Sequence, residues 1–199
     1  HSMSLTGWAE EVFDLRNSQI WEDIPNIVYG VNDEEVNPLE TTIYSAASCT
    51  TNAISPILLI LENTLGIAKG HIETVHAYTN DQNLVDNMHK KNRRGRAAAL
   101  NMVITETGAG AAVAKVIPSL HEKLSSNAIR VPVPNGSLAI LQLELKTPCS
   151  KASLLDLLKN AALKGSLVEQ VKFETNPELV SSDIIGTSAA AVIDAPATI

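Results

Sequence analysis

The sequence predicts an α+β fold. Strand-like segments are grouped together, and few of the strand–helix–strand alternations that build a doubly wound sheet are present. The composition is that of a globular protein with a sizeable core, because 45% of the 199 residues are hydrophobic and 19% are charged. The expected helices are amphipathic, so they can cover the apolar face of a sheet.

The first two expected elements lie on either side of a short polar junction. The stretch "IPNIVYGV" at 24–31 is rich in β-branched residues and predicts a buried strand. Residues 51–65 predict a helix that Gly66 can end. Its apolar residues recur at helical spacing: Ile54, Leu58, Leu61 and Leu65.

The middle of the chain combines a strand, a loop and a helix. Residues 71–79 alternate in polarity, which predicts a strand with Thr74 and His76 on one face. The polar stretch 79–97 predicts an irregular loop, and 109–120 predicts a helix ending near Pro118.

The last third returns to strands. Residues 127–135 and 137–146 predict two neighbouring strands joined by the turn dipeptide Asn135-Gly136. Residues 150–165 predict an amphipathic helix, capped by a serine at its start and closed by Gly165. Residues 183–195 predict a final strand.

Charge and composition argue against several classes of function. The net charge of −7 argues against nucleic acid as a partner, since binding to phosphate backbones needs clustered Lys and Arg. No apolar run approaches the roughly 20 residues of a membrane helix. The two cysteines, Cys49 and Cys149, are expected to be free thiols in the cytoplasm. No metal site is expected, because a strand would place His71 and His76 on opposite faces.

Cys49 stands where the polar junction meets the expected helix. The unpaired N–H groups and the positive dipole end of a helix start stabilise a thiolate and lower the thiol pKa. The short hydroxyl residues Ser48 and Thr50 can cap the helix or bind an anion there. An inert cysteine in a capping sequence is an equally simple interpretation of this spacing.

His76 is the natural partner of Cys49, because the expected strand returns from the helix after a short turn. An imidazole within hydrogen-bond reach could take the thiol proton. A core histidine with no catalytic role is the alternative. Two further features suit an anion: Thr107-Gly108 just before a helix, and Arg130 between apolar neighbours. Together they indicate a thiol enzyme acting on a phosphorylated substrate, although an internal carboxylate could instead pair with Arg130.

Several longer motifs resemble phosphorylating glyceraldehyde-3-phosphate dehydrogenases in order and spacing. They are "IVYGVN", "SAASCTTNAISPIL", "ETVHAYTNDQNLVD", "RRGRAAALNMV", "TETGAGAAVAKVIP" and "RVPVPNGS". The resemblance runs from about residue 24 to 199. It implies a mostly antiparallel mixed sheet with helices packed on one face, and it implies a homotetramer in the full-length protein.

The resemblance also implies roles for single residues. Cys49 would be the nucleophile and His76 the base in the oxidation of glyceraldehyde 3-phosphate to 1,3-bisphosphoglycerate, with NAD as the oxidant and inorganic phosphate as the second substrate, as in glycolysis. The substrate phosphate would bind Thr79 and Arg130. Inorganic phosphate would bind four further residues: Ser48, Thr50, Thr107 and Gly108. The loop 79–97 would line the cofactor pocket and pack between subunits, with Asp81 near Arg93 and Arg94.

The chain lacks some segments that members of the family usually have, and we divide it accordingly. We interpret residues 1–5 as a cloning remnant, 6–43 as the end of the cofactor-domain region, and 44–199 as a catalytic domain that stops before its final strand and helix. No G-x-G-x-x-G fingerprint is present, so no cofactor-binding residue is assigned and the chain alone is not expected to bind NAD or to turn over. Ala111 replaces a usual lysine and Ile104 a usual proline.

Three alternatives stay open on the sequence alone. An erythrose-4-phosphate dehydrogenase would use the same cysteine on a longer aldehyde. A cysteine hydrolase would also pair a thiol with an imidazole, but no orienting Asn or Asp is identifiable for it. A non-catalytic paralogue would tolerate Ala111.

Overall fold

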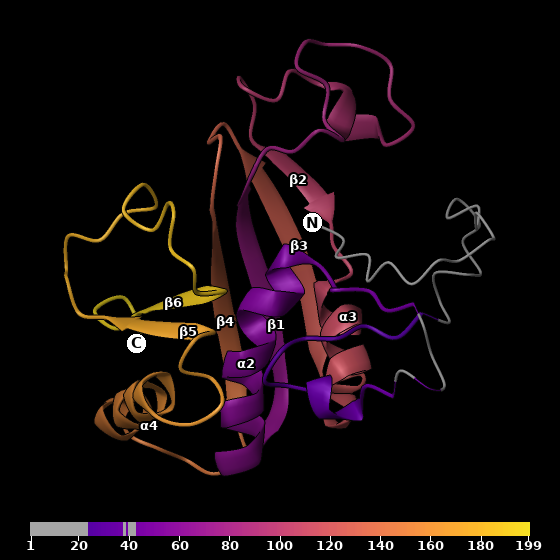
Figure 1. Cartoon of the computed structure of the whole chain (residues 1–199). Helices are drawn as coiled ribbons and strands as arrows, with labels where there is room; N and C mark the ends of the chain where they lie inside the picture. Colours follow the sequence, from indigo (N-terminus) through magenta and orange to yellow (C-terminus); the bar gives the residue numbers. More distant parts are fainter. Residues whose placement is uncertain (1–23, 38, 40–42) are drawn as a thin grey trace.

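The structure is a computed structural model that describes residues 24–37, 39 and 43–199 (Figure 1). Predictions for residues 1–5, and those parts of 6–43 that fall in 6–23, 38 and 40–42, lie outside the described residues. In chain order the elements are η1 (Asp33–Glu35), α2 (Cys49–Thr64), β1 (Ile67–Ala77), η2 (Asn92–Gly95), β2 (Val103–Glu106), α3 (Ala109–Val116), η3 (Pro118–Leu120), β3 (Leu124–Val131), β4 (Ser137–Leu145), α4 (Lys151–Leu163), β5 (Val171–Glu174) and β6 (Ala191–Asp194).

The main sheet has four strands in the order β2-β3-β1-β4. The central pair β1 and β3 is parallel, whereas β4 and β2 add antiparallel strands on either side. A separate parallel pair, β5 and β6, lies beyond β4 (Figure 1). The expected mixed, mostly antiparallel sheet is therefore confirmed, and a cofactor domain is not among the elements that the structure describes.

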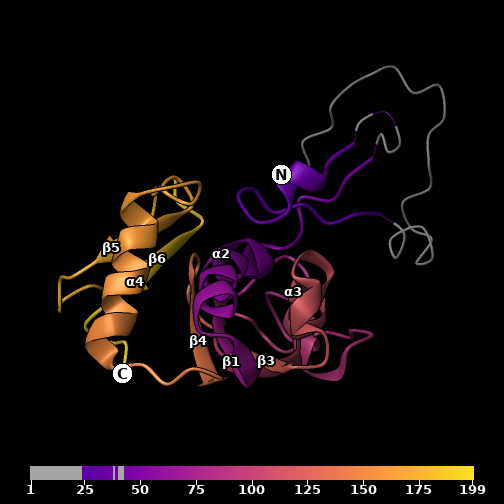
Figure 2. The same ribbon diagram turned by 90° about the horizontal axis from the view of Figure 1, so that it is seen from below.

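Helices α2 and α3 lie side by side on one face of the main sheet (Figure 2). The core fills the space between them and the sheet. Ile54 and Leu58 of α2, Ile72 of β1 and Val113 of α3 are each at most 1% exposed. Helix α4 packs against β5 and also contacts α2. The α+β class with helices on one face is thus confirmed for the main sheet.

The strand predicted at 24–31 is wrong. This segment makes one isolated bridge, Asn26 to Ser45, and then turns at residues 29–32. The side chain of Asn32 accepts a hydrogen bond from the backbone N–H of Val28 at 2.9 Å, and that of Asp33 accepts one from Gly30 at 2.7 Å. Asn and Asp side chains that satisfy nearby backbone groups favour a turn over a ladder, although Val28 is fully buried.

The hairpin predicted between 127–135 and 137–146 is also wrong, because β1 lies between β3 and β4. The Asn135-Gly136 turn exists, with Gly136 at φ 86°, but the connection passes over the end of β1. There the Gly136 carbonyl accepts a hydrogen bond from Ala77 N–H at 3.0 Å. Pro132 and Pro134 lack the N–H groups that a continuing ladder needs.

The remaining predictions hold in part. Helix α2 begins at Cys49, two residues before the predicted start, and Gly66 follows its end at φ 68°. Ser150 caps α4, since its Oγ accepts a hydrogen bond from Ser153 N–H at 3.1 Å. The strand predicted at 183–195 is confined to β6, because Gly186 adopts φ 85° within a run of turns. Among the helices described, none is long and apolar enough to cross a membrane.

Candidate active site

Cys49 is the first residue of α2. The residue before it, Ser48, has the extended backbone of a helix cap, and its Oγ accepts a hydrogen bond from Thr51 N–H at 3.1 Å. The thiol is exposed, so a substrate can reach it. Cys49 therefore stands where unpaired backbone N–H groups meet solvent.

His76 reaches Cys49 because the chain reverses tightly between α2 and β1. The N–H of Gly66 donates to the carbonyls of Leu61 and Glu62 at 3.0 and 3.1 Å, which ends the helix. Strand β1 then runs back beneath α2, with Ile72 and Thr74 buried on the face that also carries His76. The Nε2 of His76 lies 3.5 Å from the Sγ of Cys49, 27 residues away in sequence.

The two side chains change each other's acidity. The hydrogen bond from His76, helped by its charge and by hydrogen bonds from Thr50, lowers the pKa of Cys49 from 9.0 to about 7, although the partial loss of solvent around the sulfur opposes this. The hydrogen bond to Cys49 in turn raises the pKa of His76, against the effects of burial and of the nearby Arg130 charge. A substantial fraction of Cys49 is therefore thiolate at neutral pH, beside an imidazole whose protonation this contact favours.

Arg130 lies on the other side of the His76 ring. The parallel register of β1 and β3 places the two residues opposite each other. The carbonyl of Ala77 lies 2.7 Å from His76 Nδ1 and 3.0 Å from Arg130 NH1. His76 Nδ1 also lies 2.7 Å from Arg130 NH1, which can only donate, so Nδ1 faces one acceptor and one donor. In the tautomer that donates to the Ala77 carbonyl, Nε2 is free to take the thiol proton.

Arg130 is only partly satisfied by the protein. Its Nε is buried and has no hydrogen-bond partner among the described residues. Burial lowers its pKa, whereas the nearby carboxylate of Asp81 raises it. Asp81 is thus a carboxylate near Arg130, but no carboxylate lies within 4 Å of the Arg130 guanidinium in the described part of the chain.

Thr79 and Asp81 continue the site just beyond the end of β1. Thr79 is exposed, and its hydroxyl donates to Asp81 Oδ1 at 2.5 Å. Arg94 pairs with the other oxygen of Asp81 and donates to the Thr105 hydroxyl at 2.9 and 3.1 Å. Burial alone would raise the pKa of Asp81, but these hydrogen bonds and the arginine charges hold it below its ordinary value. The predicted nearness of Asp81 and Arg94 is confirmed.

The remaining predicted anion ligands lie at the two helix starts. The Ser48 Oγ is 2.8 Å from the Thr51 hydroxyl, and Thr50 lies against the Cys49 sulfur. At the start of α3, Gly108 occupies the cap position and the Thr107 hydroxyl accepts a hydrogen bond from Ala109 N–H at 3.3 Å. No hydrogen bond joins Thr107 or Gly108 to Cys49 or His76 among the described residues, although helices α2 and α3 are in contact.

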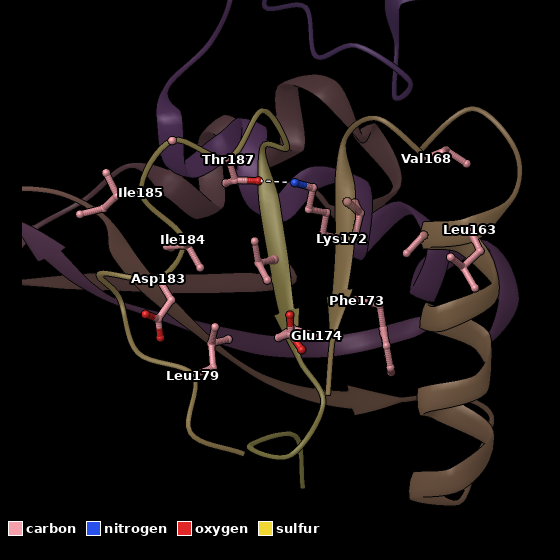
Figure 3. Close-up of a pocket in the computed structure, with 14 residues that line it drawn as sticks. Leu163, Val168, Lys172, Phe173, Glu174, Leu179, Asp183, Ile184, Ile185 and Thr187 are labelled. Atoms are coloured by element: carbon pink, nitrogen blue, oxygen red, sulfur yellow. Dashed lines mark hydrogen bonds between the residues drawn. The ribbon is translucent and has the colours of Figure 1, made fainter. Parts of the chain in front are cut away.

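A cavity of about 510 Å³ lies elsewhere, between the end of α4, the β5–β6 pair and the loop 179–187 (Figure 3). Apolar side chains such as Leu163 and Phe173 line it, together with Lys172, whose ammonium donates to the Thr187 hydroxyl at 2.8 Å. No cysteine or histidine lines this cavity, so the cavity is not a candidate site for thiol chemistry. In the described residues, no group of three or more His, Cys, Asp or Glu is placed to hold a metal ion.

Two residues near Cys49, Ala47 and Asn52, were not identified from the sequence. Ala47 adopts φ 57°, which is unusual for a residue with a β-carbon. The side-chain amide of Asn52 donates to the carbonyls of Ala46 and Ser48 at 2.6 and 3.0 Å. An asparagine in the first turn of a helix is a signal of local backbone bonding, but Ala47 carries no signal in its residue type.

Comparison with known proteins identifies one family. Residues 48–199 match the family described as "Glyceraldehyde 3-phosphate dehydrogenase, C-terminal domain". A "glyceraldehyde-3-phosphate dehydrogenase-like protein" of Pseudomonas aeruginosa is 51% identical over 176 residues, which is 88% of this chain and 38% of that protein.

Two relatives with the plain name "glyceraldehyde-3-phosphate dehydrogenase" are slightly more distant. The one from Streptomyces coelicolor is 45% identical over 89% of this chain and 52% of its own length. The one from Clostridium pasteurianum is 44% identical over 88% of this chain and 51% of its own length. The chain therefore spans about half the length of these relatives or less.

Proposed function

The chain belongs to the glyceraldehyde 3-phosphate dehydrogenase family, and from this premise we propose that it forms the catalytic part of an NAD-dependent, phosphorylating aldehyde dehydrogenase. Its substrate would be glyceraldehyde 3-phosphate and its product 1,3-bisphosphoglycerate. The observation that carries the proposal is the exposed thiol of Cys49, 3.5 Å from the Nε2 of His76 at a helix start.

Cys49 and His76 divide the proposed chemistry between them. His76 takes the thiol proton, and the Cys49 sulfur attacks the aldehyde carbon to form a carbon–sulfur bond and a thiohemiacetal. His76 Nε2 then holds the proton of the former carbonyl oxygen as the thioester forms. When bound, NAD supplies the acceptor for the hydride that leaves the same carbon. An oxygen of inorganic phosphate finally attacks the thioester, and Cys49 leaves as a thiolate.

Two groups of residues would hold the two phosphates. Arg130 and Thr79 suit the phosphate of the aldehyde, because no carboxylate of the described residues pairs with the Arg130 guanidinium and Thr79 is exposed. Inorganic phosphate would bind across the starts of α2 and α3, where backbone N–H groups favour an anion. Its ligands would be Ser48, Thr50, Thr107 and Gly108. Ala111 is an exposed residue in the first turn of α3, and it carries no charge where the family usually has a lysine.

The described residues do not fit NAD by themselves. They contain no glycine-rich turn between a parallel strand and a helix that could receive a pyrophosphate. We therefore assign no cofactor residue, and we expect calorimetry to detect no micromolar binding of NAD to this chain. Micromolar affinity would show that part of the cofactor site lies within these residues.

Protection of Cys49 from alkylation tests the proposed substrate without the cofactor. Glyceraldehyde 3-phosphate is expected to form a thiohemiacetal with Cys49 and to slow its reaction with iodoacetamide. It should do so at a lower concentration than glyceraldehyde, which lacks the phosphate, and it should leave Cys149 unaffected. Equal protection by both aldehydes would contradict the phosphate site. The same protection measured with erythrose 4-phosphate shows which of the two phosphorylated aldehydes Cys49 binds more tightly.

We also propose that the chain assembles with copies of itself. The loop after β1 exposes large apolar side chains, since Leu84 and Val85 are each 72% exposed and Met88 is 95% exposed. Leu100 and Met102 extend the same segment at 82% and 78%. Large exposed apolar side chains that gather in one segment favour a protein interface. Sedimentation velocity should show a species larger than 21.3 kDa that dissociates when Leu84 and Met88 are changed to serine.

A further inference from the structure

The turn that leads into α2 has an unusual backbone. Ala47, two residues before Cys49, lies in the left-handed region at φ 57°. A β-carbon disfavours this region, so a non-glycine residue keeps it only where neighbouring contacts hold it there. Contacts with neighbouring residues must therefore hold Ala47 in this conformation.

Asn52 supplies contacts of the right kind. Its side-chain Nδ2 donates to the carbonyl of Ala46 at 2.6 Å and to that of Ser48 at 3.0 Å, and so it bridges the residues on both sides of Ala47. The Ser48 carbonyl also accepts the first helical hydrogen bond, from Asn52 N–H at 2.9 Å. Ser45 Oγ accepts a weaker bond from Ala47 N–H at 3.2 Å.

The turn decides where the thiol points. Once the Ser48 carbonyl is fixed, the helix start is fixed, and Ser48 Oγ can accept from Thr51 N–H. The Cα–Cβ bond of Cys49 then has one direction, which brings Sγ to 3.5 Å from His76 Nε2. A rotation at Ala47 would tilt this bond and weaken the contact that activates the thiol.

We propose that Asn52 is a positioning residue, which holds the Ala46–Ser48 turn and thereby keeps the Cys49 thiol directed at His76. This role rests on the proposed function, in which Cys49 is the nucleophile. Asn52 acts through the backbone and takes no part in proton transfer or substrate binding.

The test measures how fast each cysteine reacts with iodoacetamide across pH, with mass spectrometry separating Cys49 from Cys149. Four variants are compared with the unmodified chain: Asn52→Ala, Ala47→Gly, the double variant, and Asn63→Ala. Asn63 is an exposed residue at the other end of α2, so it controls for the loss of an amide from this helix. Thermal unfolding of each variant reports the fold.

Asn52→Ala should move the midpoint of Cys49 alkylation to higher pH and slow the reaction at pH 7 by about threefold or more, since fewer molecules carry the thiolate. Ala47→Gly should restore most of this loss in the double variant, because glycine adopts the left-handed region without strain. Asn63→Ala should change nothing.

Two results would overturn this role: an unchanged midpoint in Asn52→Ala, or a raised midpoint that Ala47→Gly does not restore. A folding defect in Asn52→Ala that persists in the double variant would overturn it as well. If Cys49 of the unmodified chain reacts no faster than Cys149, the proposed function fails instead. The two failures are therefore distinguishable.

Discussion

The guanidinium NH1 of Arg130 and the imidazole Nδ1 of His76 lie 2.7 Å apart, and both are within hydrogen-bond distance of the Ala77 carbonyl. When His76 carries its proton on Nδ1, two donors converge on one acceptor. A guanidinium beside an imidazolium also opposes its positive charge. Cys49 and Arg130 therefore act on His76 in opposite directions, the first raising its pKa and the second lowering it.

Removal of the Arg130 charge should raise the pKa of His76 further. In Arg130→Leu the hydrogen bond to Cys49 remains and the opposing cation is gone, so the imidazolium persists to higher pH. Titration of the His76 ring by NMR measures this midpoint. Arg93→Leu, at an exposed arginine of the neighbouring loop, is the matched control and should leave the midpoint in place. A midpoint that moves down in Arg130→Leu would contradict the expected sign.

Loss of His76 should return Cys49 to ordinary thiol chemistry. The pKa of Cys49 is lowered from 9.0 to about 7, chiefly by its hydrogen bond to His76, so His76→Asn should move it back toward 9.0. At pH 7 the thiolate fraction then falls steeply. The greater nucleophilicity of a more basic thiolate offsets part of this, which leaves a net loss of about fivefold to tenfold in alkylation rate.

Mass spectrometry of the iodoacetamide reaction measures that rate for each cysteine separately. Cys149 serves as the internal reference, and His121→Asn, at an exposed histidine far along the chain, serves as the matched variant. Equal rates for Cys49 in His76→Asn and in the unmodified chain would show that His76 does not activate the thiol.

The pair formed by Glu62 and Lys123 should make stability depend on pH. The Glu62 carboxylate accepts hydrogen bonds from Ile67 N–H at 2.6 Å and from Lys123 Nζ at 3.0 Å, and its side chain is only 12% exposed. Burial alone would raise the pKa of Glu62, but these bonds hold it below 4.5. The stabilisation is present above about pH 4.5 and is lost as the pH falls through the lower folded-state value.

Glu62→Gln should therefore lower the free energy of unfolding at pH 7 by about 2 kcal/mol, because it leaves the Lys123 ammonium without its charge partner. The difference in free energy of unfolding between Glu62→Gln and the unmodified chain should become smaller in acid. Glu144→Gln breaks an exposed pair with Lys69, whose side chains are 60% and 74% exposed, and should cost less than about 1 kcal/mol. Urea unfolding at neutral and acid pH gives both values, and a gap that widens in acid would contradict this account.

The sequence was sufficient for the class of fold but not for the order of the strands. Amphipathic spacing located α2 and α4, because their apolar faces follow from local sequence. The position of β1 between β3 and β4 depends on contacts between distant segments, which no local pattern records. The turn dipeptide Asn135-Gly136 indicated a hairpin, but it closes a longer connection whose prolines end the strands.

At the site, residue chemistry was predictable and backbone geometry was not. A helix start, a following strand and a short return were enough to pair Cys49 with His76, since all three are local features. The nearness of Arg130 to His76 depends on the parallel register of β1 and β3. The φ of Ala47 could not be anticipated, because alanine rarely adopts that conformation and the side-chain bonds around it, from Asn52 and to Ser45, are visible only in the structure.

Helix α3 approaches β3 closely at Gly110. A β-carbon at Gly110 would lie 2.6 Å from the carbonyl oxygen of Leu124, a backbone atom that cannot move away alone. Gly110→Ala should therefore displace α3 and lower the free energy of unfolding by about 2 kcal/mol. Gly108→Ala is the matched control, since its β-carbon meets nothing within 4 Å, and it should cost less than about 1 kcal/mol as a change of cap residue. Urea unfolding compares the two, and equal losses would mean that the contact between α3 and β3 is loose enough to admit a methyl group.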